Sequence, residues 1–135
     1  MASYFMTSKL LKEWVAKACE DLEAAQILFK NRRKNFSALV CFHCHQFAEK
    51  YLKAFLISLG TQPPRIHHLA KLLDLAVEKE PALELIRDLL DTLEAYGVDV
   101  RYPGNHPPRT AARKALKASE QLKKFLDDHF KGSAL

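Results

Sequence analysis

Two cysteines and a histidine within five residues form the first group in this chain whose types and spacing could do chemistry. Cys41, Cys44 and His45 fit the C-x-x-C-H pattern of covalent haem attachment, and they could also give zinc three ligands. Free cysteine is equally common as a small buried hydrophobe. Because so short a pattern often matches by chance, we expect the cysteines to be structural and expect neither a metal nor a cofactor.

The helical period of residues 36–59 accounts for the same group in another way. At about 100° per residue, one wide face of this segment is apolar. It carries Phe36, Val40, Cys44, Phe47, Tyr51 and Phe55. Glu49 and Lys53 fall on the opposite side, interleaved with Phe42 and Leu56. A helix that is apolar on one side and partly apolar on the other packs against two surfaces, so we expect it inside a bundle or against a second subunit.

Composition limits the class of protein. The chain has 135 residues, 48% of them hydrophobic and 27% charged, which is typical of one soluble globular domain spanning residues 1–135. No apolar run approaches the roughly 20 residues that span a bilayer, so we expect no membrane partner. Three cysteines and an N-terminus without a signal-peptide pattern predict a cytoplasmic protein.

Positive charge is concentrated near the C-terminus. Between Arg109 and Lys124 there are six Lys or Arg residues and one Glu, within a net charge of +5. Such a stripe on one helix could meet phosphates or an acidic partner. It could equally keep the outer face of the helix solvated, and the sequence leaves both interpretations open.

Hydrophobic periodicity predicts five helices and no strand. The predicted segments are 8–29, 36–59, 68–79, 81–96 and 109–130. Ser8 is the predicted N-cap of the first, Asn35 is placed to cap the second, and Gly60 is placed to end it. Residues 97–108, with Gly104 and three prolines, form a loop. Short connections of this kind predict an all-α fold, an antiparallel up-and-down bundle of about five helices.

Several segments in order resemble one family. They are HCHQFAEKYLKAFL from residue 43, PP at 63–64, HHL at 67–69, and RYP at 101–103 before the last helix. This order is similar to the HEPN domain (higher eukaryotes and prokaryotes nucleotide-binding). The resemblance implies a helical bundle that is commonly a homodimer, here through the second and last helices, found in toxin–antitoxin systems. It also implies a minimal nucleotidyltransferase as partner, encoded beside it.

A further part of the resemblance concerns RNA cleavage. Many HEPN proteins are metal-independent endoribonucleases whose signature is Arg, four to six residues, then His, and Arg101 and His106 satisfy that spacing. The histidine could take a proton from a ribose 2′-hydroxyl, and the arginine could hold the scissile phosphate. However, Pro107 and Pro108 follow the histidine, so the pair is expected in a loop rather than on a helix.

The family name also implies a nucleotide site. Glu49 and Lys50 could line a nucleotide cleft with Lys53, and Tyr102 could stack on a base. The alternative is a purely structural role, in which the lysines pair with nearby acids and the tyrosine packs against the bundle. The sequence therefore predicts a nucleotide- or partner-binding module in a two-gene system, with a ribonuclease toxin using Arg101 and His106 as the alternative.

Overall fold

The computed structural model describes residues 2–97 and 102–130, with side chains from 9 to 96 and from 102 to 130, and these residues contain helices and no strand. The elements are α1 (Ala2–Lys30), α2 (Ser37–Ser58), α3 (Leu69–Lys79), the 3-10 helix η1 (Pro81–Ile86), α4 (Arg87–Gly97) and α5 (Arg109–His129). The all-α bundle predicted from periodicity is therefore confirmed. None of the described helices is long and apolar enough to cross a membrane.

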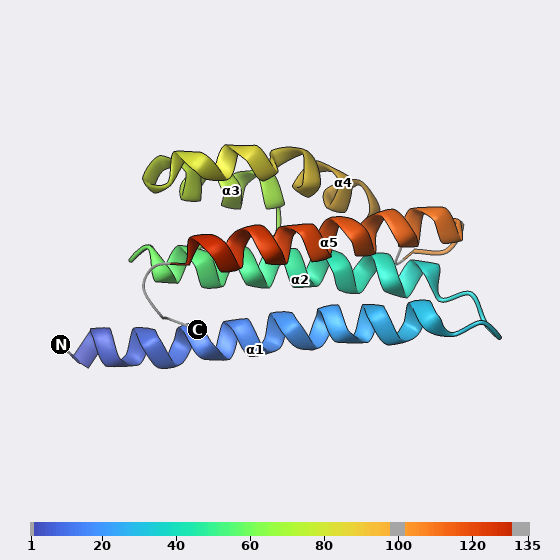
Figure 1. The fold of residues 1–135 in the computed structure, drawn as a ribbon, viewed down its shortest axis with the longest axis horizontal. Coiled ribbons are helices and arrows are strands. Elements are labelled where there is room, and N and C mark those ends of the chain that lie inside the picture. Colours follow the sequence, from blue (N-terminus) through green and yellow to red (C-terminus); the bar gives the residue numbers. More distant parts are fainter. Residues whose placement is uncertain (1, 98–101, 131–135) are drawn as a thin grey trace.

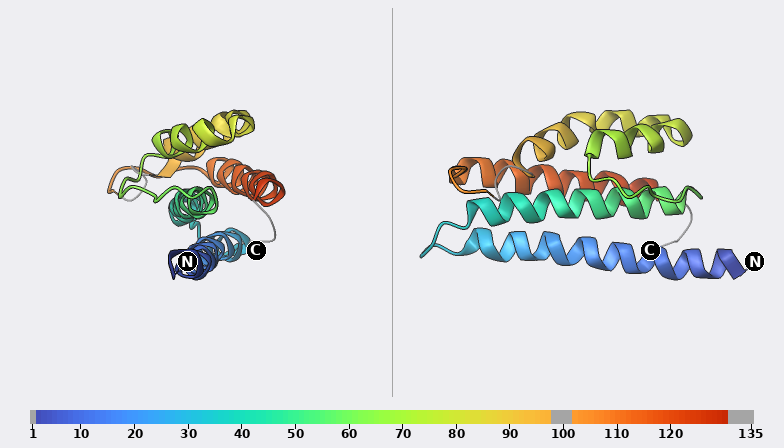
Figure 2. Two further views of the ribbon diagram at one scale, coloured as in Figure 1. Left: turned by 90° about the vertical axis from the view of Figure 1, so that its left-hand side faces the viewer. Right: turned by 180° about the vertical axis from the view of Figure 1, so that it is seen from behind.

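The helices lie in layers, with α1 on one side, α2 and α5 in the middle, and α3 with α4 on the other side (Figures 1 and 2). α1 and α2 are antiparallel neighbours. Residues 61–68 then run back along α2, so that α3 points in the same direction as α2, and α4 returns toward the end where α5 begins (Figure 2). This path leaves α5 beside α2 and antiparallel to α4. Because α2 and α3 point the same way, the helices do not alternate strictly up and down as the sequence predicted (Figure 2).

α2 is the central helix, because it contacts α1, α3, α4 and α5. Fifteen of its 22 residues are buried. The expectation that this helix packs against more than one surface is confirmed, and it lies inside the bundle. The expected polar side is not at the surface, however, because Glu49 and Lys53 are each only 5% exposed. Tertiary packing around most of α2 has overridden the polar pattern at these two positions.

The two ends of α2 differ in how far they follow the sequence prediction. Phe36 occupies the N-cap position without a side-chain cap bond, so Asn35 is not the N-cap; it lies one residue earlier, and its Oδ1 accepts a hydrogen bond from the Ser37 amide at 2.9 Å. At the other end Gly60 has φ +81°, a conformation open to glycine. Its amide donates to Ile57 O, and the Thr61 amide donates to Leu56 O, each at 2.9 Å. These two bonds make a Schellman motif, and Gly60 ends the helix as predicted.

Two predicted helix starts differ from the structure. Ser8 is not an N-cap, because α1 begins at Ala2 and continues through residue 8 without a break. No proline or glycine precedes Ser8 to stop the helix there. The fourth helix begins as η1 rather than as an α-helix, with Pro81 in its first turn and the Leu83 amide bonded to Glu80 O at 3.0 Å. α4 proper starts only at Arg87.

The core is built from large side chains on α2 and small ones on α5. Phe47 and Tyr51 are fully buried and stacked, with ring centroids 5.0 Å apart. The buried stripe of α5 consists of Ala111, Ala112, Ala115, Ala118, Ser119, Leu122 and Leu126. Alanines along the first half of that stripe let the backbone of α5 come close to α2, while the aromatic rings fill the remaining space.

Candidate functional site

Asp21 on α1 holds two basic side chains of α2. His43 Nδ1 lies 2.8 Å from Asp21 Oδ1, and Lys50 Nζ lies 2.6 Å from Asp21 Oδ2. The two α2 residues are seven positions apart, which is two helical turns, so they stand on one stripe of α2 facing Asp21. Asp21 is 12% exposed, whereas Lys50 is 27% exposed. Lys50 is thus paired with an acid and still reaches the surface.

Glu49 and Lys53 form a buried ion pair one turn apart on α2. Lys53 Nζ lies 3.0 Å from Glu49 Oε2, and the two side chains are 7% and 6% exposed. His67 Nδ1 lies 2.8 Å from the same carboxylate oxygen. The ammonium group of Lys53 is also 5.6 Å from the ring centroid of Trp14 on α1. Among the described residues Glu49 Oε1 has no hydrogen-bond partner. These groups join α2 to α1 and to residues 61–68.

Glu94 on α4 ties the outer layer of helices to α2. His45 Nε2 lies 2.8 Å from Glu94 Oε2, and the Leu69 amide donates to Glu94 Oε1 at 2.7 Å. Glu94 therefore caps the first turn of α3 from a distance of 25 residues, while His68 occupies the N-cap position without a side-chain cap bond. No local sequence signal marks this contact.

The cysteines of the C-x-x-C-H pattern lie in the core. Cys41 and Cys44 are free thiols with no exposed surface. Burial raises the pKa of Cys41 to about 11 and the pKa of Cys44 to about 12. His45, the third residue of the pattern, faces Glu94. Within the part of the chain that the structure describes, no three His, Cys, Asp or Glu side chains converge in a way that suits a metal ion.

The predicted ribonuclease pair is only partly visible. Arg101 lies outside the described residues. His106 is exposed in the loop that leads into α5, three residues before the helix begins at Arg109. Pro108 takes the N-cap position with an extended backbone at ψ 164°, so the loop conformation continues up to the helix. The histidine is thus held by a loop, as the two prolines predicted, and not by the rigid frame of α5.

The predicted ligand residues do not form one cluster. Glu49 and Lys53 meet beneath the surface, while Lys50 turns to Asp21. Tyr102 is 59% exposed in the loop seven residues before α5. Of the four, Lys50 and Tyr102 reach solvent. Nothing in these positions decides a role in nucleotide binding, which stays a prediction.

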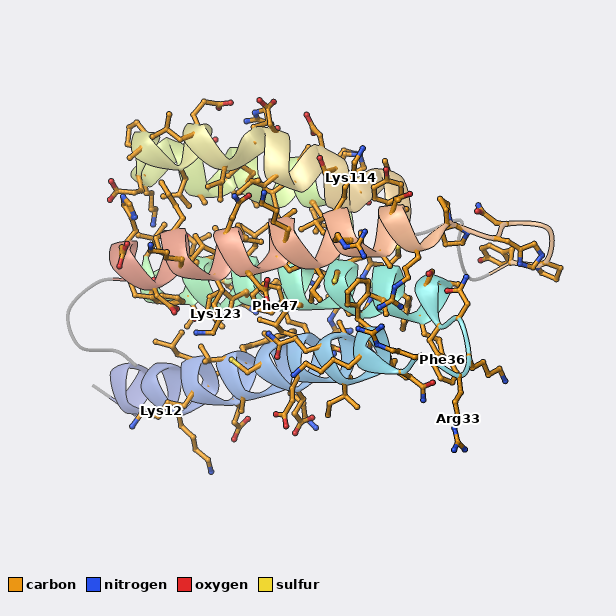
Figure 3. The ribbon with its side chains drawn as sticks, turned by 45° about the vertical axis from the view of Figure 1, so that its right-hand side comes forward. Lys12, Arg33, Phe36, Phe47, Lys114 and Lys123 are labelled. Atoms are coloured by element: carbon orange, nitrogen blue, oxygen red, sulfur yellow. The ribbon has the colours of Figure 1, made fainter. Side chains whose placement is uncertain are left out.

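The start of α5 is fastened to the end of α1. Arg109 Nη2 donates to Phe29 O at 2.8 Å, and its guanidinium lies 4.0 Å from the centroid of the Phe29 ring. Arg113, one turn later, lies 5.6 Å from the same centroid. This contact brings the first turns of α5 to the last turn of α1, near the α1–α2 connection at residues 31–35, where Arg33 projects outward (Figure 3).

A family model named HEPN domain matches residues 11–129 of the chain. The chain belongs to the HEPN domain family. The match covers all five described α-helices except the start of α1, and it agrees with the helical bundle and with the order of segments noted in the sequence. No curated protein and no solved structure matches the chain. Membership makes this HEPN protein a nucleotide-binding or ribonuclease-like module.

Proposed function

We propose that this HEPN protein is a nucleotide- and partner-binding module, the HEPN half of a two-gene system with a minimal nucleotidyltransferase. The position of His106 carries this proposal. A general base needs its geometry held tightly by the surrounding structure. His106 lies in an exposed loop before α5, so a binding role suits this end of the molecule better than proton transfer in a cleft.

Lys50 is the best-placed of the predicted ligand residues to contact a nucleotide. Its ammonium group is anchored by Asp21 and remains 27% exposed, so it can meet a phosphate without losing its position. Glu49 and Lys53 support it from beneath, because their buried ion pair fixes the same turns of α2. Lys50→Gln should weaken binding of ATP, measured by calorimetry, while the fold remains intact.

The proposal includes a homodimer in the cytoplasm. α2 is mostly enclosed within the chain, so an interface through α2 would use its remaining surface strip, which includes the exposed Leu39. α5 would contribute from its solvent-facing side. Light scattering after size exclusion measures the mass directly, and a particle of the monomer mass at micromolar concentration would contradict the dimer.

Co-purification tests the partner. The tagged HEPN protein is expressed in its native cells, captured, and the bound proteins are identified by mass spectrometry. We expect a small protein with a nucleotidyltransferase active site to be enriched over an untagged strain. A capture that contains no nucleotidyltransferase, together with no measurable affinity for ATP, would contradict the proposal.

A ribonuclease toxin is the second candidate, and one observation favours it. His106 follows Arg101 in the Arg-x4-His spacing, and it lies three residues before the basic start of α5. Expression of the HEPN protein alone, with wild-type and His106→Ala forms compared, tests this candidate. Growth arrest and RNA loss confined to the wild type would favour the toxin over the binding module.

A further inference from the structure

The carboxylate of Asp21 determines which ring nitrogen of His43 carries a proton. Asp21 Oδ1 lies 2.8 Å from His43 Nδ1, and Asp21 Oδ2 lies 2.6 Å from Lys50 Nζ. A carboxylate that is ion-paired with an ammonium group has oxygens that only accept hydrogen bonds. His43 Nδ1 is therefore the donor to Asp21. In the neutral ring, a proton on Nδ1 leaves Nε2 as a hydrogen-bond acceptor.

This acceptor is open to a ligand. His43 is 26% exposed, and its Nε2 has no hydrogen-bond partner among the described residues and is not enclosed by the protein. The ring stands in the second turn of α2, the central helix, and Asp21 holds it from α1. His106, in contrast, lies in a loop. Of these two histidines, His43 thus has the more rigid frame for binding a ligand.

Two further polar side chains continue the stripe of α2 that begins at His43. Gln46 lies three residues after His43 and four before Lys50, so the three side chains share one face of the helix. Gln46 is half-buried and makes no hydrogen bond with another described residue, while Lys50 is 27% exposed. Within about 10 Å of helix axis the stripe therefore offers an acceptor, an amide and a cation.

We propose that His43 recognises a ribose hydroxyl of the nucleotide whose phosphate Lys50 binds, so that the site prefers ribonucleotides to deoxyribonucleotides. Phosphate oxygens accept hydrogen bonds, so they match the ammonium of Lys50, whereas a hydroxyl donates and matches Nε2 of His43. Asp21 is a positioning residue, because it fixes the ring and anchors the ammonium. The inference rests on the proposed function, since it names the sugar that the nucleotide site selects.

The protonation of the ring is testable without any ligand. Nitrogen-15 NMR of the wild-type protein at alkaline pH, where the ring is neutral, distinguishes a proton on Nδ1 from a proton on Nε2. The signals of His43 are those absent from the spectrum of His43→Asn. We expect the Nδ1–H form. A ring that carries its proton on Nε2 would overturn the proposal, because Nε2 would then be a donor.

Calorimetry with ATP, 2′-deoxy-ATP and 3′-deoxy-ATP tests the recognition of the sugar. We expect the wild type to bind at least one of the deoxy analogues about 3- to 10-fold more weakly than ATP, as a single hydrogen bond at a partly exposed site provides. The measured quantity is the ratio of the two affinities. A substitution that merely disturbs the fold weakens all three nucleotides equally and leaves this ratio unchanged.

Two substitutions of His43 separate its two nitrogens. In His43→Asn the amide can still donate to Asp21, but nothing replaces Nε2, so the ratio should fall to about 1. In His43→Gln the amide oxygen reaches the place of Nε2 and should retain part of the preference. His129→Asn is the matched control at the far end of α2, where the neighbouring Phe130 ring packs on Phe55. It should keep the wild-type ratio.

Equal affinity of the wild type for ATP and both analogues would overturn the proposal, as would an unchanged ratio in His43→Asn. Either result, obtained with measurable binding of ATP, leaves the proposed function intact. Absence of any ATP binding also removes the present inference. Capture of the partner protein then decides separately whether the two-gene proposal stands.

Discussion

Lys53 donates to Glu49 one turn earlier on α2 at 3.0 Å, and both side chains are buried where the sequence pattern indicates a polar surface. An exposed pair of this kind stabilises a helix by only a few tenths of a kcal/mol. A buried pair behaves differently, because removing one partner leaves the other charge without compensation. We therefore expect substitution of either residue to lower stability much more than a surface position would.

Single substitution of either partner should be strongly destabilising. We expect Glu49→Gln and Lys53→Met each to lower the free energy of unfolding by about 3–5 kcal/mol, measured with urea. Each substitution leaves the charge of the other residue buried and without its partner. The double variant should cost less than the sum of the two, by about 0.5–3 kcal/mol. Glu20→Gln, an exposed control on α1, should change stability by less than about 0.5 kcal/mol. Additive losses would mean that the two side chains do not interact.

Phe47 should be among the most sensitive core positions. It is fully buried and stacked on Tyr51. Replacement with alanine should cost about 3–5 kcal/mol, since it removes the ring and leaves a cavity beside α2. Leu85→Ala, at a side chain that is 79% exposed, supplies the comparison and should be nearly neutral. A loss for Phe47→Ala as small as that for Leu85→Ala would contradict its place in the core.

The sequence allowed the apolar face of α2 to be predicted, because Val40, Cys44, Phe47, Tyr51 and Phe55 recur with the period of one buried side. The second buried side could not be predicted in the same way. Polar residues there are compensated by partners on other elements, and a pattern within one helix contains no information about such partners.

Glu94 should control the attachment of α3 and α4 to α2. Glu94→Ala removes the acceptor of the Leu69 amide and the partner of His45, which should cost about 1–3 kcal/mol. Hydrogen exchange should show faster exchange in the first turn of α3, with the amides of α1 unchanged. Glu78→Ala, at an exposed position of α3, is the matched control. Equal exchange in the two variants would show that Glu94 does not cap α3.

Alkaline pH should destabilise the protein through its buried thiols. The folded-state pKa of Cys44 is raised by burial to about 12, and that of Cys41 to about 11, from 9.0. A raised pKa means that the folded state holds the proton more tightly, so this stabilisation is complete below pH 9 and is lost as pH rises toward 11 or 12. By pH 10.5 each thiol should have lowered the free energy of unfolding by about 2 kcal/mol relative to its value below pH 9.

Urea unfolding between pH 8 and pH 10.5 measures this loss. The double variant Cys41→Ala/Cys44→Ala should be less stable at pH 8, because it leaves small cavities, and should depend less steeply on pH. Parallel pH curves for the wild type and the double variant would contradict the assignment to these thiols. Tyr51 adds a loss of the same sign at higher pH, since burial and the bond to Asp127 raise its pKa.

The candidate sites, too, could be predicted only where the signal is local in the sequence. The prolines after His106 correctly predicted a loop before α5, because proline restricts its own backbone and that of its predecessor. The docking of Arg109 against Phe29 could not be predicted, since the two residues are 80 positions apart and neither segment alone indicates the contact.

Binding without cleavage is the central claim, and incubation of the purified protein with labelled RNA in EDTA tests it most directly. Bound and cleaved RNA are followed in the same samples for the wild type, Arg101→Ala and His106→Ala. We expect the RNA to stay intact with all three proteins. Cleavage by the wild type that is lost in both variants, with the fold and oligomeric state unchanged, would contradict the binding module and establish a ribonuclease.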